Sequence, residues 1–320
     1  MTIAKNVAVR LAKLLAVVLI VSFLTFSLTK LLPGNPIDQL LGTQASNPTA
    51  RAALTERLGL DKPFFEQYGT YVTGAIQGDL GYSYSNRFET TTLLKQALPA
   101  SLELMILAQV LSILISVPLA MISAYRANSR LDRAITTTAF GLISVPGFAF
   151  AVFLVYIFSL QLGWFPAVGY SALSDGVVDN LRSIALPLMV LVAGLTAVYT
   201  RILRSDLIAT LQEDFVLMAR SKGLPTWHIL LRHALRPSSF SLLTVFGINF
   251  GTLIGGSVIL ETFFAIPGVG QVAVRSILQR EFLVTQGVVL VIATAFVLVN
   301  FLVDILYSVL DPRIRRSGAT

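Results

Sequence analysis

The 320-residue sequence predicts an all-α integral membrane protein with six transmembrane helices. Three observations support this fold class. Hydrophobic residues make up 55% of the chain and charged residues only 13%, against roughly 25% charged residues in ordinary soluble domains. Apolar runs long enough to cross a bilayer recur along the chain. Lys and Arg gather beside alternate ends of these runs, as they do where basic loops stay in the cytoplasm.

Six apolar runs are predicted to span the membrane as helices, because a spanning helix needs roughly 20 consecutive apolar residues. They cover residues 11–31, 101–125, 134–160, 184–200, 240–260 and 286–310. The first run is longer than the apolar part of a signal peptide, and no small-residue cleavage pattern follows it. We therefore expect it to remain in the protein.

A long polar segment, residues 32–99, separates the first two spans. Gly and Pro residues set its corners, and residues 52–58 and 64–76 are predicted to form short helices with one apolar face each. Because aromatic side chains are typical of membrane–water interfaces, a compact cap over the outer mouth is one interpretation of this segment. Its candidate surface aromatic residues are Tyr68, Tyr71, Tyr82, Tyr84 and Phe88.

The basic residues flank the spans on one side of the predicted membrane. Lys and Arg precede the first span and follow the second, fourth and sixth, whereas the other side mixes bases with as many acids. The positive-inside rule then predicts a multi-pass protein of the cell membrane, with both termini and residues 213–237 in the cytoplasm. This asymmetry explains the net charge of +7 without a nucleic-acid partner, so we expect none.

Small and polar residues inside the last two spans predict helix packing. Gly247, Gly251 and Gly255 recur every four residues, which places them along one side of the fifth span and permits close helix approach. Asn300 and Asp304 share one face of the sixth span and can hydrogen-bond a neighbouring helix. Both patterns favour packing seams over a pore lining.

Residues 213–237, with the sequence EDFVLMARSKGLPTWHILLRHALRP, interrupt two apolar segments, and we call them the peg. The first half predicts a short helix that ends at Gly223, the residue type that closes helices in the left-handed conformation. Pro225 suits the start of a second helix, in which Trp227 and Leu231 recur at helical spacing. A helix, a glycine corner and a second helix would project from the membrane and contact another protein.

Motifs for catalysis and metal binding are absent from the sequence. There is no phosphate-binding G-x-x-x-x-G-K-[ST] loop, and the two histidines, His228 and His233, lack the H-E-x-x-H pattern of zinc proteases. Glu213 and Asp214 are adjacent and suit a helix N-terminus, although a partner could also contact them. Without cysteine, the chain has no disulfides or thiolate metal sites. We expect no enzyme activity, metal or cofactor in this chain.

Several motifs carry a family resemblance. The run E-D-F-V-L-M-A-R-S-K-G followed by L-R-H-A-L-R-P resembles the cytoplasmic EAA loop of binding-protein-dependent ABC importers, in the peptide and nickel branch of their permeases. L-P-G-N-P, L-G-L-D-K-P, G-D-L-G-Y-S, I-S-V-P-G-F and E-T-F-F-A-I-P-G-V-G resemble the same family in the same order. The resemblance covers nearly the whole chain. Asn35 and Phe215 depart from the family, in which an acidic residue and a tyrosine are usual.

The resemblance implies the type I ABC importer permease (MetI-like) fold. An N-terminal transmembrane helix and extracytoplasmic segment would occupy residues 1–98, and a five-helix permease core residues 99–320. Expected partners are membrane lipid, a second, similar permease in a heterodimer, two ATPase chains that bind ATP and magnesium, and an extracytoplasmic binding protein that delivers di- or oligopeptides. The residues expected to couple to the ATPases are Glu213, Asp214, Phe215, Leu217, Met218, Ala219, Arg220, Lys222 and Gly223.

The same resemblance adds a second interpretation of residues 32–99, whose aromatic residues would help to dock the binding protein. Two functional alternatives also stay open. Nickel or glutathione is carried by relatives with similar motifs, so another small solute is compatible with the pattern. A self-contained secondary transporter would need intramembrane carboxylates for a coupling ion, for which Glu103 and Asp304 are the candidates.

Overall fold

The computed structural model describes residues 3–31, 37, 41, 47–57, 59–83 and 88–310. These residues fold almost entirely as helices, with one isolated antiparallel bridge between Tyr82 and Glu89. They form two compact units, Met1–Ser101 with Pro267–Leu298 and Leu102–Ile266 with Val299–Thr320. This grouping differs from the division predicted after residue 98, because the segment Pro267–Leu298 belongs with the N-terminal part of the chain.

The first unit contains helices from both ends of the sequence. Its own helices are α1 (Ile3–Leu31), α3 (Pro48–Arg57), α4 (Phe64–Ile76) and α12 (Val269–Leu278). It also includes the first part of α5 (Thr90–Tyr125) and of α13 (Phe282–Leu310). Apolar side chains of α5, α12 and α13 form its core, namely Leu94, Ala97, Val269, Ala273, Val284 and Val288.

Aromatic side chains attach α4 to α1 in the first unit. The Phe26 ring lies 5.2 Å from that of Phe64 and 5.5 Å from that of Tyr68. The Tyr68 hydroxyl is hydrogen-bonded to the Ser22 hydroxyl over 2.8 Å, and the Tyr71 hydroxyl donates to the Gln286 carbonyl over 3.3 Å. Burial raises the pKa of Tyr71 to about 12. Tyr68 and Tyr71 therefore hold this unit together.

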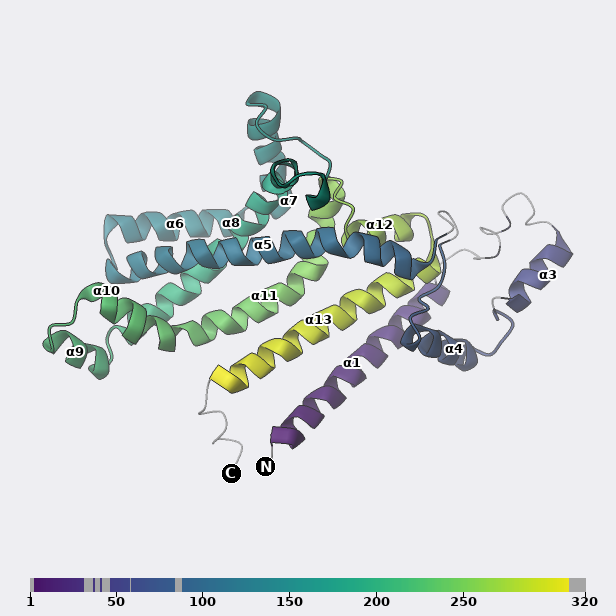
Figure 1. Ribbon diagram of the computed structural model, residues 1–320, viewed down its shortest axis with the longest axis horizontal. Helices are drawn as coiled ribbons and strands as arrows, with labels where there is room; N and C mark the ends of the chain where they lie inside the picture. The colour runs from purple at the N-terminus through teal and green to yellow at the C-terminus, as the bar shows by residue number, and fades with distance from the viewer. Residues whose placement is uncertain are drawn as a thin grey trace. The chain divides into compact units, whose positions relative to one another are not determined.

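The second unit is organised around α8 (Val177–Thr210), which packs against α6 (Arg130–Ser144), α7 (Gly147–Leu154) and α11 (Leu235–Phe263) (Figure 1). The remaining elements are η2 (Val155–Gln161), η3 (Leu173–Asp175), α9 (Asp214–Ser221), α10 (Thr226–His228) and η4 (Ile229–Ala234). Tyr199, Leu203 and Leu207 of α8 are fully buried in its core. These residues lie at helical spacing, so one continuous face of α8 is enclosed by its neighbours.

The part of α5 in this unit presents a stripe of small residues that sequence reasoning missed. Ala108, Ser112, Ser116, Ala120 and Ala124 recur every four residues, and each is at most 5% exposed. Such a stripe lets helix backbones approach closely in a membrane. The Ser112 hydroxyl accordingly reaches the Val192 carbonyl of α8 at 3.5 Å, besides bonding within its own helix.

The predicted spans match helices, and two of the helical stretches are bent pairs, Arg130–Ser144 with Gly147–Gln161 and Thr226–Leu253 with Ser257–Phe263. Residues 134–160 do not form one straight helix, because α6 and the helical stretch Gly147–Gln161 meet at 102°. Val145 is extended (φ −88°, ψ 124°), as expected before Pro146, which disfavours helical backbone in the preceding residue. Among the described residues, three helices are long and apolar enough to span a membrane, or up to five if each bent pair counts once. The number six stays a prediction.

Candidate functional site

The corner of the peg has the geometry that its sequence predicts. Helix α9 begins after Glu213, and Asp214 lies in its first turn, where acidic side chains favour the helix dipole. Gly223 follows with φ +75°, a left-handed conformation that suits glycine. Its N–H donates to the Arg220 carbonyl over 2.9 Å, and a Cβ there would meet no atom within 4 Å. Backbone conformation, and not crowding, thus requires glycine at this corner.

The two faces of α9 differ in exposure. Val216 is fully buried and Ala219 is 6% exposed, and both pack with Ile229 of η4. The other apolar side chains of α9 are open, since Phe215 is 45%, Leu217 51% and Met218 59% exposed. Val216 and Ala219 therefore hold the two halves of the peg together. Ala219 is among the residues predicted to couple to the ATPases, whereas Val216 is not. Glu213, Asp214, Arg220 and Lys222 are exposed.

The second half of the peg is continuous with a membrane span. Pro225 caps α10, which passes through the π-helical η4 directly into α11. The helix does not break at Pro237, because the wider π turn before it accommodates a residue that lacks an N–H. The backbone of the peg is thus continuous with that of α11. Trp227 and Leu231 on this half are 64% and 50% exposed.

The base of the peg joins α8 to α11. The hydroxyls of Thr210, at the end of α8, and Ser238, in the first turn of α11, are hydrogen-bonded over 2.9 Å. Leu207 and Ala234 beside them are fully buried in the same core. The peg therefore projects from a closed junction of two packed helices.

Near this base, a partly buried ion pair and a neighbouring hydroxyl join three helices. We call the three residues, Ser123, Asp132 and Arg204, the clamp. The Arg204 guanidinium of α8 donates to both carboxylate oxygens of Asp132 of α6, over 2.6 and 2.7 Å. Its Nε also donates to the Ser123 hydroxyl of α5 over 3.0 Å, and Ser123 donates to Asp132. The backbone N–H of Asn128 also donates a hydrogen bond of 2.8 Å to the Asp132 carboxylate.

Sequence reasoning missed the clamp and counted Arg204 only as one of the basic residues beside a span. One local signal was present. Asp132 follows Ser129 by three residues, and the Ser129 hydroxyl accepts a hydrogen bond from the Asp132 N–H, as at many helix N-termini. That signal predicts the start of α6 but cannot indicate the partner on α8.

Two acidic residues within the second unit accept hydrogen bonds from hydroxyls. Glu103 accepts a hydrogen bond of 2.7 Å from Tyr170. Burial of the Tyr170 hydroxyl, and secondly its hydrogen bond to the Glu103 carboxylate, raise the pKa of Tyr170 to about 12. The buried Glu261 accepts a hydrogen bond of 2.9 Å from Ser257. Over the described residues, no three His, Cys, Asp or Glu side chains are placed to hold a metal ion.

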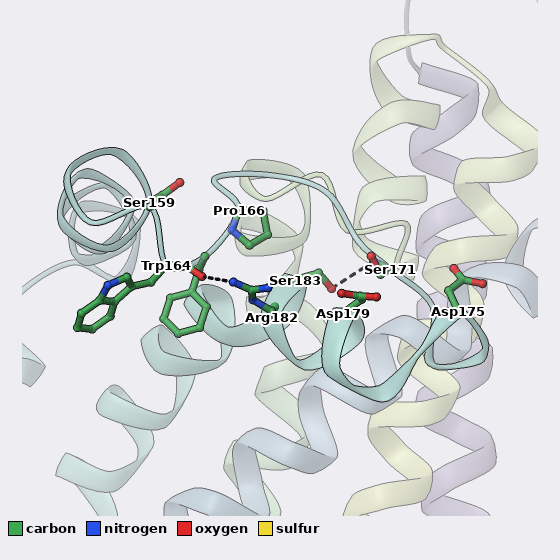
Figure 2. Close-up of a pocket in the computed structure, with 10 residues that line it drawn as sticks. Ser159, Trp164, Pro166, Ser171, Asp175, Asp179, Arg182 and Ser183 are labelled. Atoms are coloured by element: carbon green, nitrogen blue, oxygen red, sulfur yellow. Dashed lines mark hydrogen bonds between the residues drawn. The ribbon is translucent and has the colours of Figure 1, made fainter.

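An open pocket of about 470 Å³ lies where α8 begins, at the end away from the peg (Figure 2). Trp164 and Arg182 lie on one side and Asp175 and Asp179 on the other, and Arg182 donates to the Trp164 carbonyl over 3.4 Å. The 34 residues of α8 make it roughly 50 Å long, so the pocket and the peg are separated by about a membrane thickness.

The other predicted site residues are distributed over both units. Tyr82 and Phe88 are 41% and 55% exposed, whereas Tyr84 lies outside the described residues. Gly247 packs so closely against Val303 that a Cβ there would overlap it; Gly251 is buried, but Gly255 is exposed. Asn300 is half-buried, and the side chain of Asp304 lies outside the described residues.

These features define a helical, multi-pass membrane protein with a two-helix peg. The family model "Binding-protein-dependent transport system inner membrane component" matches residues 116–316, and the corresponding N-terminal model matches residues 4–105. The chain belongs to this family of ABC importer permeases and is therefore a multi-pass inner-membrane transport subunit.

Individual relatives are similar over nearly their whole length. A peptide transport system permease protein of Brucella abortus is 38% identical over 96% of this chain and 97% of its own. The di/tripeptide transport system permease of Pseudomonas aeruginosa is 36% identical, covering 97% and 98%. The glutathione transport system permease of Shigella flexneri is 34% identical, covering 96% and 97%.

A solved structure supports the fold. The MetNI methionine ABC transporter in an inward-facing conformation contains a chain that is 16% identical, with a TM-score of 0.56 over 68% of this chain and 96% of that one. At this identity the likeness concerns the fold alone, and it confirms the predicted helical, MetI-like class.

Proposed function

We propose that this chain is one of two permease subunits of an ATP-driven importer that brings di- or oligopeptides into the cell. The observation that carries the proposal is the peg, whose exposed Phe215, Leu217 and Met218 extend from a rigid junction of α8 and α11. Exposed apolar side chains on a short helix suit a groove on a partner protein. Two relatives are named as permeases for peptide and di/tripeptide transport, which supports peptides as the cargo of this chain.

In this proposal the peg lies in the cytoplasm and contacts one of two ATPase chains, which bind ATP and magnesium. Nucleotide-driven closure of the ATPases displaces the peg, and α8 and α11 carry that displacement across the membrane. An extracytoplasmic binding protein releases peptide into a path formed with the second, similar permease. The distribution of Lys and Arg supports this orientation, with both chain termini on the peg side.

The pairing of Glu103 weakens the case for a self-contained secondary transporter. Of the two candidate carboxylates, Glu103 is hydrogen-bonded to Tyr170 and so serves a contact within the second unit. A coupling-ion site requires intramembrane carboxylates whose oxygens are available to the ion.

Reconstitution tests the proposal. The chain, the second permease of the proposed importer and the ATPases are placed in liposomes, and uptake of a labelled dipeptide is measured with loaded binding protein outside and ATP inside. We expect uptake only when ATP and binding protein are both present. Uptake by this chain alone, or uptake driven by an ion gradient without ATP, would contradict the proposal.

The cargo is tested separately, because one relative is named for glutathione. Unlabelled dipeptides, tetrapeptides and glutathione are added in turn as competitors of labelled dipeptide. We expect the peptides to compete most strongly. Selective competition by glutathione would show that glutathione is the cargo. The proposed role of the peg would stay the same.

A further inference from the structure

The clamp fixes the geometry between three helices of the second unit. Arg204 and Asp132 form a bidentate pair, in which two parallel hydrogen bonds set both the distance and the angle between α8 and α6. The Ser123 hydroxyl adds α5 to the same network. The Asp132 side chain is 4% and the Arg204 side chain 24% exposed, so solvent screens the pair only weakly.

The clamp stands between the peg and the rest of the unit. From Arg204, α8 continues for less than two turns to Thr210, where the Ser238 hydrogen bond closes the base of the peg. The buried Leu207 lies between these two points. A displacement of the peg therefore reaches Arg204 through a short, packed stretch of helix.

Packing also joins these helices, because α6 contacts α8 and apolar side chains of α5 and α8 are buried together. Ala120 and Ala124 of α5 and Leu203 of α8 are buried in one apolar cluster. Buried ion pairs contribute little net stability compared with apolar side chains of similar volume. What the bidentate pair adds is a fixed orientation, because apolar contacts permit sliding and tilting that two parallel hydrogen bonds do not.

We propose that Asp132 and Arg204 are positioning residues that make α5, α6 and α8 move as one body when the peg is displaced. This inference rests on the proposed function, in which the ATPases drive the peg. With the clamp intact, peg displacement rotates all three helices together. With the clamp broken, α8 tilts alone, so the ATPases still hydrolyse ATP but fewer peptides cross the membrane in each cycle.

The measurement is the number of peptides imported per ATP hydrolysed, in liposomes that contain the complete importer. Asp132→Asn keeps the shape of the side chain but removes its charge, and Arg204→Lys keeps the charge but removes the bidentate geometry. We expect both variants to assemble and hydrolyse ATP, with import per ATP lowered by about tenfold. Glu66→Gln is the matched control, because it removes the carboxylate from an exposed ion pair in which Lys62 and Glu66 lie 2.8 Å apart. This variant should leave the number of peptides imported per ATP unchanged.

A charge exchange adds a test of the pairing itself. Asp132→Arg and Arg204→Asp are each expected to lower import per ATP, and their combination is expected to recover part of it. If the exchanged protein fails to fold, Asp132→Asn and Arg204→Lys decide the matter. A wild-type ratio in these two variants, with only a lower melting temperature or yield, would overturn the proposal and leave the clamp a structural contact.

The experiment distinguishes a failure of the clamp proposal from a failure of the proposed import function. Wild-type liposomes that show no ATP-dependent uptake contradict the proposed function before any variant is compared. Wild-type liposomes that import peptide, with variants of unchanged ratio, contradict only the clamp proposal.

Discussion

The Tyr199 hydroxyl donates a hydrogen bond of 2.7 Å to the side-chain oxygen of Gln109, and this bond joins α8 to α5 inside the second unit. Tyr199 is fully buried and Gln109 is 1% exposed. No water competes at such a depth, so the Gln109 oxygen depends on Tyr199 for this hydrogen bond.

Removal of this bond should destabilise the protein. Tyr199→Phe leaves the Gln109 oxygen buried without its donor, which costs about 1–3 kcal/mol. Gln109→Leu should have a similar effect, whereas the double variant should lose less than the sum, because both polar partners are then gone. Thermal unfolding of the detergent-purified complex measures all three, and strictly additive losses would show that the two residues do not interact.

The contact between Gly247 and Val303 predicts a substitution with a specific rescue. Gly247→Ala places a Cβ against the Val303 methyl groups and should lower the melting temperature. Val303→Ala in the same chain should restore much of the loss. Gly255→Ala is the matched control, because nothing lies within 4 Å of its Cβ position. Equal effects at the two glycines would show that helix propensity, and not the contact, decides the result.

The peg corner predicts a variant that assembles but does not transport. Gly223→Val forces a branched side chain into a backbone with φ +75°, which costs on the order of 1 kcal/mol and re-aims α9. We expect normal insertion, with loss of peptide uptake and of ATP hydrolysis stimulated by binding protein. Gly163→Val, at φ +65° with no atom within 4 Å, imposes similar strain outside the peg and should retain both activities. Full activity of the Gly223 variant would remove the peg from the mechanism.

The orientation can be tested with single cysteines in this cysteine-free chain. Gln77 and Lys222 are both exposed and have negative φ angles, so cysteine fits at either position without strain. A membrane-impermeant maleimide should label Gln77→Cys in intact cells but label Lys222→Cys only after the cells are opened. The reverse pattern would invert the proposed topology.

Docking of the binding protein is predicted to involve the exposed aromatic residues of the first unit. Tyr82→Ala and Phe88→Ala should weaken capture of loaded binding protein, measured by its retention on liposomes, while assembly with the ATPases is preserved. Tyr68→Phe is the contrasting variant, because the Tyr68 hydroxyl is bonded inside the unit to Ser22. It should lower stability without changing capture. Unchanged capture in the first two variants would make the segment a structural cap.

Local signals in the sequence determined the helical membrane class, the approximate spans and the corner of the peg. Apolar runs need the length of a bilayer, and a left-handed helix end at Gly223 needs glycine, so each feature is encoded by consecutive residues. The bend at Pro146 also has a local cause, because proline disfavours helical backbone in the residue before it.

The tertiary structure alone decided which side chains meet. Asp132 and Arg204 are 72 residues apart in the chain, and Val216 and Ala219 turn inward only because Ile229 lies against them. The small-residue stripe of α5 acquires its meaning from Val192 on α8 in the same way. Such contacts depend on how helices distant in sequence pack together, and this depends on the fit of many side chains at once, which no local pattern specifies.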